Sequence, residues 1–440
     1  MNLPAGRVPK KTSMNVIDFV TVFLLFYYID FSFYPLESYL SGGESEVALP
    51  VPVTTLSLVL VSLLIFIYVA KSNGRVKFLG GVSLIYIFVF FAFFSFVWST
   101  DAAMTIKRAL RYLPTMTLGI VFAQYYPLRK ILRLMVLAFF ISACVGILLS
   151  VAVPTLGISR IGGAYEGAWR GVQVHKNFTG DIMATGILIL FGAWMTKNLS
   201  SLLAAGAGLP MALMLIMSSS GTALMAAVAA IAVSLSIIAI RPMPKKLRPM
   251  LLVALLCFTV GTFLALYMNI ELFFENAGRD MTFTGRTYIW TAVWEKIWEH
   301  PIIGEGYGMW SSPNNNANLW IKMMSGDMGT AHSHNTWLDV WLQLGIVPLG
   351  IIVYCCVYML FASVYRLLWC GDNEAVIYIA LAVYIWIRSF FEIQFTDPWM
   401  AGIFWLTWSL TRLKVTKPRV AGRGALPHPR HRNMRMPSLA

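Results

Sequence analysis

Arginine and histidine side chains stand in two polar segments that interrupt an otherwise apolar chain, and these residue types suit two chemical tasks. Arginine stays charged and can hold the oxygens of an anion with paired donors, as Arg170 and Arg286 could do. A histidine such as His334 can titrate near neutral pH and take a proton from a hydroxyl group. The three positions are therefore candidates for binding an anion and activating a hydroxyl.

The polar segment 271–335 is by far the longest connection between apolar runs, and a connection of this length is usually functional or has structure of its own. Apolar residues recur at helical spacing within 287–301, which predicts an amphipathic helix lying at a membrane surface. They are Trp290, Val293, Trp294 and Ile297. Arg286 lies at the start of this helix, where an anion would also meet the backbone donors of a helix N-terminus.

The same segment ends in the sequence Ala-His-Ser-His-Asn, immediately before a long apolar run. His332, His334 and Asn335 therefore lie at a boundary between polar and apolar sequence. The two histidines could supply two metal ligands, but no suitable carboxylate or cysteine cluster accompanies them, and the sequence predicts no metal site. A polar boundary pair without a chemical role is the other interpretation.

The other polar segment, 154–177, carries four basic or titratable side chains and one acid, Glu166. The four are Arg160, Arg170, His175 and Lys176. Asn177 follows them directly. The candidates for substrate binding in this segment are Arg160, His175, Lys176 and Asn177.

The elements that must position these residues are membrane helices. Of the 440 residues, 58% are apolar and only 12% are charged, about half the charged share of a soluble domain. Apolar runs long enough to cross a hydrocarbon core recur along most of the chain. The predicted spans are Val16–Tyr34, Val51–Ala70, Phe78–Trp98, Tyr112–Gln124, Ile131–Val153, Phe178–Thr196, Ser200–Met217, Thr222–Ile240, Met250–Ile270, Thr336–Tyr365, Ala375–Phe391 and Trp399–Leu413. We expect one helical bundle over residues 1–413.

The distribution of basic residues predicts the orientation. The net charge is +14, but most of the 34 lysines and arginines fall in alternate loops, which argues against nucleic-acid binding and for the positive-inside rule. Both termini are then cytoplasmic, and the two polar segments lie outside. The run from Val16 has no small-residue cleavage site after it and is expected to stay as a first helix.

Two further features complete the outline. Residues 414–440 are basic and contain no acid, so we expect a disordered cytoplasmic tail lying against anionic lipid. The five cysteines lie in or at the ends of apolar segments with no Cys-x-x-Cys pair, which favours small core residues over disulfides or a zinc site.

Three sequence segments resemble the bacterial O-antigen ligase and O-antigen polymerase superfamily, which includes polymerases of exopolysaccharide repeat units. The resemblance covers most of the chain in layout and these three segments in sequence. They are Gly167-Ala168-Trp169-Arg170-Gly171 leading to His175-Lys176-Asn177; Thr284-Gly285-Arg286-Thr287 leading to Trp290 and Pro301-Ile302-Ile303-Gly304; and His334-Asn335 leading to Leu344-Gly345.

The resemblance implies an all-α integral membrane protein of the bacterial inner membrane, with about 12 transmembrane helices and a large periplasmic loop between helices 9 and 10. It implies a glycosyltransferase with an undecaprenyl-diphosphate-linked glycan as donor, no metal and no cofactor. Arg170, Arg286 and His334 carry over as catalytic residues, the arginines holding the diphosphate and His334 acting on the acceptor hydroxyl. A flippase and a chain-length regulator of the same pathway are the expected partners, beside membrane lipid.

Four interpretations of the function are weighed. A polymerase joins lipid-linked repeat units and is the favoured reading, whereas a ligase transfers the glycan to a terminal acceptor such as the lipid A core. A secondary transporter would also fit about 12 spans, but no internal repeat is evident and the polar residues gather outside the spans. A scaffold without activity would leave the arginine and histidine pattern unexplained.

A few residues outside the motifs are weaker candidates. Arg111, with Lys107 and Arg108, could attract the diphosphate or form a charge patch at a helix end. Arg388 and Glu392 are spaced i, i+4 near the outer end of a span, which is typical of a functional pair or of a structural ion pair. Asp181 is expected to be a residue of a helix end.

Overall fold

The computed structural model describes residues 14–28, 62–63, 65–70, 77, 82–159, 166–268, 282–312, 315–326, 330–396 and 402–415. Within this part of the chain every regular element is a helix, and one isolated antiparallel bridge joins Ile158 to Trp169. The prediction of an all-α protein is confirmed.

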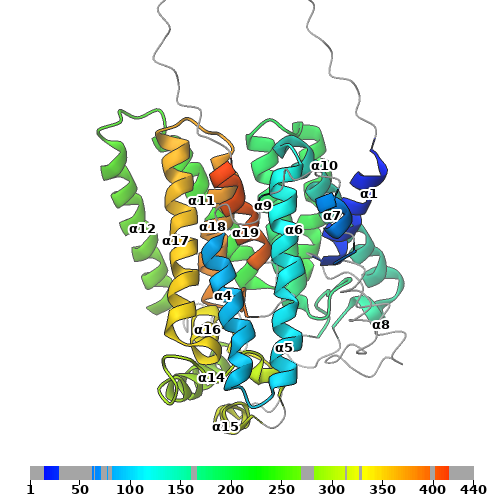
Figure 1. The fold of residues 1–440 in the computed structure, drawn as a ribbon. Coiled ribbons are helices and arrows are strands. Elements are labelled where there is room, and N and C mark those ends of the chain that lie inside the picture. Colours follow the sequence, from blue (N-terminus) through cyan, green and yellow to red (C-terminus); the bar gives the residue numbers. More distant parts are fainter. Residues whose placement is uncertain are drawn as a thin grey trace, which may run out of the picture.

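The long helices stand side by side as a bundle (Figure 1). They are α1 (Val16–Tyr28), α4 (Ser83–Phe94), α6 (Tyr112–Tyr125), α7 (Leu128–Ala152), α9 (Lys176–Met195), α10 (Ser201–Met217), α11 (Gly221–Ile240), α12 (Arg248–Met268), α17 (Ile346–Leu368), α18 (Ala375–Ser389) and α19 (Gly402–Val415). Among the described helices, α7, α9, α11 and α17 are long and apolar enough to cross a membrane by length and composition, and shorter apolar helices accompany them. The total of about 12 spans stays a prediction.

Helices α9 and α18 occupy the interior of the bundle. Helix α18 is apolar on all faces and almost entirely buried, as expected for a helix surrounded by others. Helix α9 places glycines where neighbours approach closely: a Cβ at Gly192 would lie 2.5 Å from Ile377 of α18, and one at Gly186 would lie 2.9 Å from Phe139 of α7. Small residues at such contacts are typical of helices packed in membranes.

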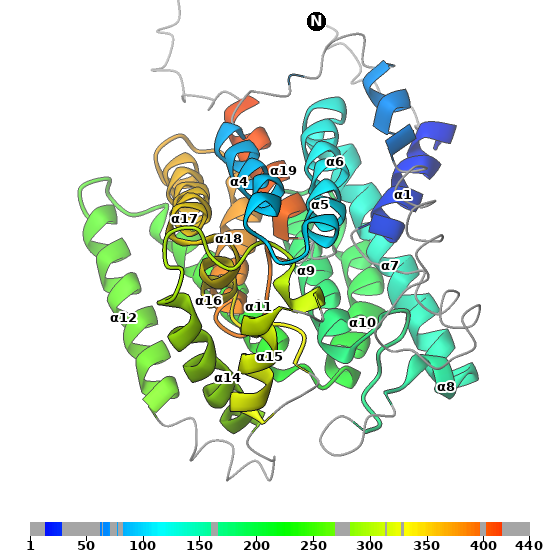
Figure 2. The ribbon, with the colours of Figure 1, turned by 60° about the horizontal axis from the view of Figure 1, so that its bottom comes forward.

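Short helices collect at one end of the bundle, at the bottom of Figure 1 and turned forward in Figure 2. They are α5 (Ala102–Leu110), α8 (Pro154–Gly157), α14 (Thr282–Ile297), α15 (Asn316–Ser325) and α16 (Thr336–Leu344), with the 3-10 turns η1 (Ser95–Val97) and η3 (Met309–Ser311). The predicted sites fall at this end because they lie in the connections that these short helices form.

The long polar segment has a small core of its own, as its length predicts. Ile289, Val293 and Ile297 of α14 are buried against Ile321 of α15 and Leu342 of α16. The face of α14 predicted to lie on a membrane is therefore used largely for packing within the protein. Trp294 is the exception, because 46% of it is exposed.

The position of Arg286 differs from the prediction. Helix α14 begins at Thr282 instead of near Thr287, so Arg286 lies in its second turn. The backbone donors of a helix N-terminus belong to the first turn, one turn before this side chain. The expectation that an anion at Arg286 would also meet those donors is wrong, and Arg286 must act through its own guanidinium.

The predicted span Thr336–Tyr365 is also wrong as a single helix, because Gly345 divides it into α16 and α17. Gly345 has φ 85° and ψ −176°, a conformation that only glycine adopts readily. A Cβ there would lie 1.9 Å from the carbonyl oxygen of Ile302. The segment around Ile302 therefore packs directly against Gly345, where α16 ends and α17 begins. The Ile346 N–H donates to the carbonyl of Pro301 at 3.1 Å.

This break generates a prediction. Gly345→Ala should lower the free energy of unfolding by more than about 3 kcal/mol, because it adds backbone strain to the clash with Ile302. Gly350→Ala is the matched control in α17, since nothing lies within 4 Å of a Cβ at that position. Thermal unfolding of the detergent-extracted variants measures both. Equal midpoints for the two variants would contradict the assigned conformation of Gly345.

Candidate active site

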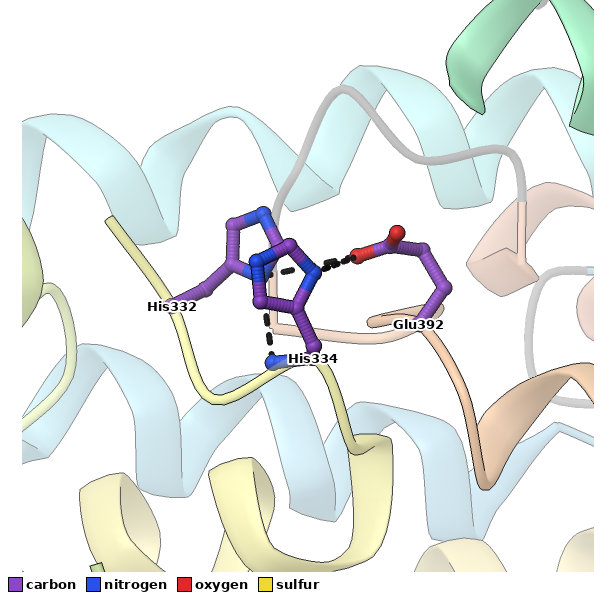
Figure 3. A group of neighbouring side chains, drawn as sticks. All are labelled: His332, His334 and Glu392. Carbon is purple, nitrogen blue, oxygen red and sulfur yellow. Dashed lines mark hydrogen bonds and ion pairs between the residues drawn. The ribbon is translucent and has the colours of Figure 1, made fainter. Parts of the chain in front are cut away.

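A buried carboxylate, Glu392, lies where the polar segments meet. Only 1% of Glu392 is exposed, and it follows the C-terminal end of α18. One of its oxygens, Oε1, lies 3.1 Å from Nδ1 of His334 and 3.5 Å from Nδ1 of His332. The other, Oε2, accepts a hydrogen bond from Asn177 Nδ2 at 3.3 Å and lies 3.9 Å from Arg388 Nη2. Figure 3 shows both histidine rings turned toward this carboxylate.

These neighbours keep Glu392 ionised. Burial alone would raise the pKa of a carboxyl group because the charged form loses its hydration. His334, through its charge and its hydrogen bond, and the charge of Arg388 act in the opposite direction and hold the pKa of Glu392 well below its usual range. The site is thus built around a fixed negative charge.

The hydrogen bonds distinguish the histidines. Nδ1 of His332 accepts the backbone N–H of His334 at 3.2 Å, and Nδ1 of His175 accepts the backbone N–H of Asn177 at 3.2 Å. Because a backbone N–H can only donate, both rings are neutral with the proton on Nε2. The 3.5 Å contact of His332 with Glu392 is then not a hydrogen bond. His334 alone among the three presents Nδ1 to the carboxylate as a donor.

Burial reinforces this assignment for two of the rings. Burial, then the charge of His334, lowers the pKa of His332 to about 3, with Arg286 adding to the effect. Burial lowers the pKa of His175 to about 4, although the charge of Glu392 opposes this. Both rings therefore stay neutral at the pH values at which bacteria grow. The preference for His334 over His332 in the sequence motif agrees with this geometry.

Hydrogen bonds also fix the backbone around His334. The Ser333 N–H donates to Asp339 Oδ1 at 3.1 Å, and the Ser333 carbonyl accepts Trp290 Nε1 at 2.9 Å. His334 itself has φ 53°, a left-handed conformation that is uncommon for a residue with a side chain. Asn335 caps α16 through the backbone N–H groups of residues 337 and 338, so its side chain acts in the fold of this segment.

Asp339 was missed by sequence reasoning. It is fully buried within α16, where it also accepts Trp310 Nε1 at 2.9 Å and Gln343 Nε2 at 2.6 Å. An acid in the first turn of a predicted apolar span was the available signal, since such residues are rare without a partner.

Arg286 reaches the same place from α14. Its Nη1 donates to the carbonyl of Phe391 at 3.0 Å, next to Glu392 in the chain. The positive charge of Arg286 also helps to lower the pKa of His332. The structure thus brings two of the three predicted catalytic residues, Arg286 and His334, to the adjacent residues Phe391 and Glu392.

Arg170 lies near the cluster through His175. Arg170 is buried, with 7% of the residue exposed, and its Nε donates to the carbonyl of Leu156 at 3.0 Å. Gly171 takes a left-handed conformation directly after it, with φ 57°, which explains a glycine at this place in the motif. The charge of Arg170 acts on His175, and His175 interacts in turn with Glu392 and His334.

Arg388 connects the cluster to the interior of the bundle. Its Nε donates to Asp181 Oδ1 at 2.9 Å, and its Nη1 donates to Thr222 Oγ1 at 2.8 Å. Asp181 also accepts Tyr384 Oη at 2.6 Å. The predicted pair of Arg388 and Glu392 is confirmed, whereas Asp181 is not a simple helix-end residue: it is a buried partner of Arg388.

The remaining candidates lie further from Glu392 or cannot be placed. Lys176 begins α9 and its Nζ donates to the carbonyl of Ser219 at 3.4 Å. Arg111 lies between α5 and α6, and its neighbour Arg108 donates to Ser311 Oγ at 2.5 Å. Arg160 lies outside the described residues.

The cluster has the spacing of a metal site. His332, His334 and Glu392 place ligand atoms within 4.8 Å of one another, so the premise that no carboxylate accompanies the histidines is wrong. Arg388 near Glu392 and Arg286 near His332 nevertheless place two guanidinium groups beside the trio, of which Arg388 is paired with Asp181. Positive charge this close to the ligand atoms disfavours a divalent cation. That no metal is used stays a prediction.

Comparison with known proteins supports the motif assignment. Residues 203–355 match the family model described as O-Antigen ligase. The chain is also 27% identical over 345 residues to the Exopolysaccharide production protein ExoQ of Rhizobium meliloti (strain 1021), a match that covers 77% of this chain and 78% of that protein. The resemblance indicated by the three sequence segments is confirmed, and with the apolar helices it identifies a multi-pass membrane protein.

The lowered pKa of His332 predicts a pH dependence of stability. Its pKa is about 3 in the folded protein, so the unfolded chain, with an ordinary value near 6.5, binds a proton first as the pH falls. The free energy of unfolding should therefore fall between about pH 6.5 and pH 3, and His332 should account for about 2 kcal/mol of the loss by pH 5.

His332→Asn isolates this contribution, because its amide oxygen can still accept the N–H of His334 but does not titrate. The unfolding midpoint in detergent should fall less between pH 7 and pH 5 for this variant than for the wild type. An equal fall in both proteins would show that His332 titrates normally in the folded state.

Proposed function

We propose, from the resemblance of this chain to the O-antigen ligase and polymerase-like family, that it polymerises lipid-linked oligosaccharide repeat units during exopolysaccharide or O-antigen synthesis. The observation that carries the proposal is the convergence of Arg286 and His334 on the segment at Glu392. The donor would be a glycan attached to undecaprenyl diphosphate. The chain would lie in the bacterial inner membrane, with both termini in the cytoplasm and this site on the periplasmic face.

The residue types match the steps of such a transfer. The bond between the first sugar carbon and the diphosphate oxygen breaks, and the oxygen of an acceptor hydroxyl forms the new glycosidic bond. Nε2 of His334 receives the hydroxyl proton. The lipid diphosphate leaves with the bonding electrons, and guanidinium groups of Arg286 and Arg170 stabilise the charge that develops on its oxygens.

The position of the site also suits a lipid-linked substrate. The cluster lies at one end of the helical bundle, beside α14 and α16, so a lipid tail could stay in the membrane while the headgroup reacts (Figure 1). His175, Lys176 and Asn177 at the start of α9, together with His332, would bind the headgroup or sugars. A flippase and a chain-length regulator of the same pathway are the proposed partners.

A ligase remains the second candidate, because the same donor site would serve transfer to a terminal acceptor such as the lipid A core. The family match, described as O-Antigen ligase, favours it, whereas the similarity to an exopolysaccharide production protein favours polymerisation. A secondary transporter is less well supported, because it does not require a histidine held against a buried carboxylate or an arginine at the neighbouring carbonyl.

Substitution of the reacting groups tests the proposal. In a deletion strain, His334→Ala should reduce polymer formation by roughly 100-fold or more, because it removes the proton acceptor. Arg286→Ala should cost roughly 100-fold through lost charge stabilisation. Gel analysis of glycan size and of lipid-linked intermediates measures the outcome, and an immunoblot checks the membrane level of each variant.

Two residues of the same segment serve as matched controls. His300→Ala removes an exposed histidine, and Lys296→Ala removes a positive charge from α14 that pairs with Glu299. Both should retain wild-type polymer. Loss of long polymer with accumulated single repeat units supports a polymerase, and full-length polymer retained on its lipid carrier indicates a ligase. Wild-type behaviour of His334→Ala would reject the site.

Removal of metal gives an independent prediction. If arginines neutralise the leaving group, washing isolated membranes with EDTA should leave the lengthening of lipid-linked glycans within about twofold of its starting rate, since no cation is needed at the diphosphate. An activity that disappears with EDTA and returns with added Mg²⁺, Mn²⁺ or Zn²⁺ would instead assign the trio of His332, His334 and Glu392 to a metal.

A further inference from the structure

We infer that Glu392 is a positioning residue whose carboxylate holds His334 with its proton on Nδ1, so that Nε2 is left to accept a proton from the substrate hydroxyl. This inference rests on the proposed function and concerns a residue outside the segment that matches the O-Antigen ligase family, 203–355. Its basis is the contact of 3.1 Å between His334 Nδ1 and Glu392 Oε1, together with the way both groups are held.

The exposure of the two side chains fits this division of roles. The side chain of Glu392 is 2% exposed, whereas that of His334 is 25% exposed. Because Nδ1 lies against the buried carboxylate, the accessible part of the ring is the remainder, which carries Nε2. A carboxylate that accepts from one ring nitrogen fixes which tautomer is present and how the ring is oriented. Such an arrangement also stabilises the imidazolium that forms when Nε2 takes a proton.

Glu392 is itself held from several elements. Asn177 at the start of α9 donates to Oε2, and Arg388 of α18 lies 3.9 Å from the same oxygen. Arg388 is fixed by its bond to Asp181 of α9 at 2.9 Å. These partners engage Oε2, while Oε1 faces His334 and also accepts the backbone N–H of Ile393 at 3.4 Å. The orientation of the carboxylate is thus determined by groups that lie in the interior of the bundle.

The backbone on either side of the contact is also constrained. The Glu392 carbonyl accepts Thr336 Oγ1 at 2.7 Å, and the Phe391 carbonyl accepts Arg286 Nη1 at 3.0 Å. Across from it, His334 adopts its left-handed backbone conformation, which costs of order 1–3 kcal/mol and persists only where surrounding bonds impose it. This conformation turns the ring of His334 toward Glu392, which supplies a physical reason for the strain.

Other charged or titratable groups act on the pair or on its neighbours and must stay unchanged in a test. His332 and Arg388 act on Glu392 itself, Arg286 acts on His332, Lys176 and Arg170 act on His175, and Asp181 holds Arg388. Only a substitution at Glu392 removes the carboxylate while leaving all of these in place.

The experiment compares Glu392→Gln and Glu392→Asp with the wild type in proteoliposomes, using as donor and acceptor the lipid-linked repeat units extracted from a deletion strain. Glu392→Gln should lower kcat by about 100-fold or more with KM for the lipid-linked unit within about threefold, since binding does not require the tautomer. The acid limb of the kcat–pH profile should move to lower pH, because the negative charge that favours a protonated ring is gone.

Glu392→Asp keeps the charge and should restore activity to within about tenfold of the wild type, with the acid limb where the wild type has it. Glu374→Gln is the matched control: it removes a carboxylate at the other end of α18, 3.6 Å from Arg412, and should change neither kcat nor the profile. A wild-type kcat for Glu392→Gln overturns the inference, as does a loss of activity with an unmoved profile, which indicates a structural role only.

Two outcomes separate this inference from the proposed function. If His334→Ala is inactive while Glu392→Gln is fully active, the positioning role is wrong and the proposed reaction stands. If His334→Ala is itself active, the proposed site fails and the inference fails with it. Should Glu392→Gln not reach the membrane, Glu392→Asp decides: a kcat far more than tenfold below the wild type overturns the positioning role, because that variant keeps the carboxylate.

Discussion

Burial of a charged carboxylate at Glu392 is the constraint on which the surrounding structure depends. An ionised carboxylate removed from water destabilises a protein by several kcal/mol unless hydrogen bonds and opposite charge replace its hydration. Here His334 contacts one oxygen, while Asn177 and Arg388 lie at the other. Since these partners come from α9, α18 and the segment before α16, the one charge draws together parts of the chain that are far apart in sequence.

The same requirement explains how the described parts of the long polar connection are held. Helices α14 and α15 of this connection form a small core with the following helix α16, and that core carries Arg286 to the carbonyl of Phe391. The break at Gly345 lets α16 leave the line of α17 and bring the histidine segment over the end of the bundle. A straight helix through this position would continue along α17 and would leave His334 elsewhere.

The apolar helices could be predicted from sequence because each run is long, and α7, α9 and α11 appear near their expected limits. The start of α17 could not, because the break at Gly345 lies inside an apolar run. The motifs identified Arg286 and His334. The role of Glu392 toward His334 could not be predicted, since 58 positions separate them and the packing of α16 on α17 and of α17 on α18 brings them together. Asp181 was misread for the same reason, and the start of α14 was placed too late because its first residues carry no apolar pattern.

The central claim is that this site breaks the bond between a glycan and its lipid diphosphate. The most direct measurement follows purified wild-type protein in proteoliposomes that contain only lipid-linked repeat units and no nucleotide. The account predicts release of one undecaprenyl diphosphate for each new glycosidic bond, with products that grow by whole repeat units. Repeat units that cross the bilayer at unchanged length, with no lipid diphosphate released, would contradict it and would identify a transporter.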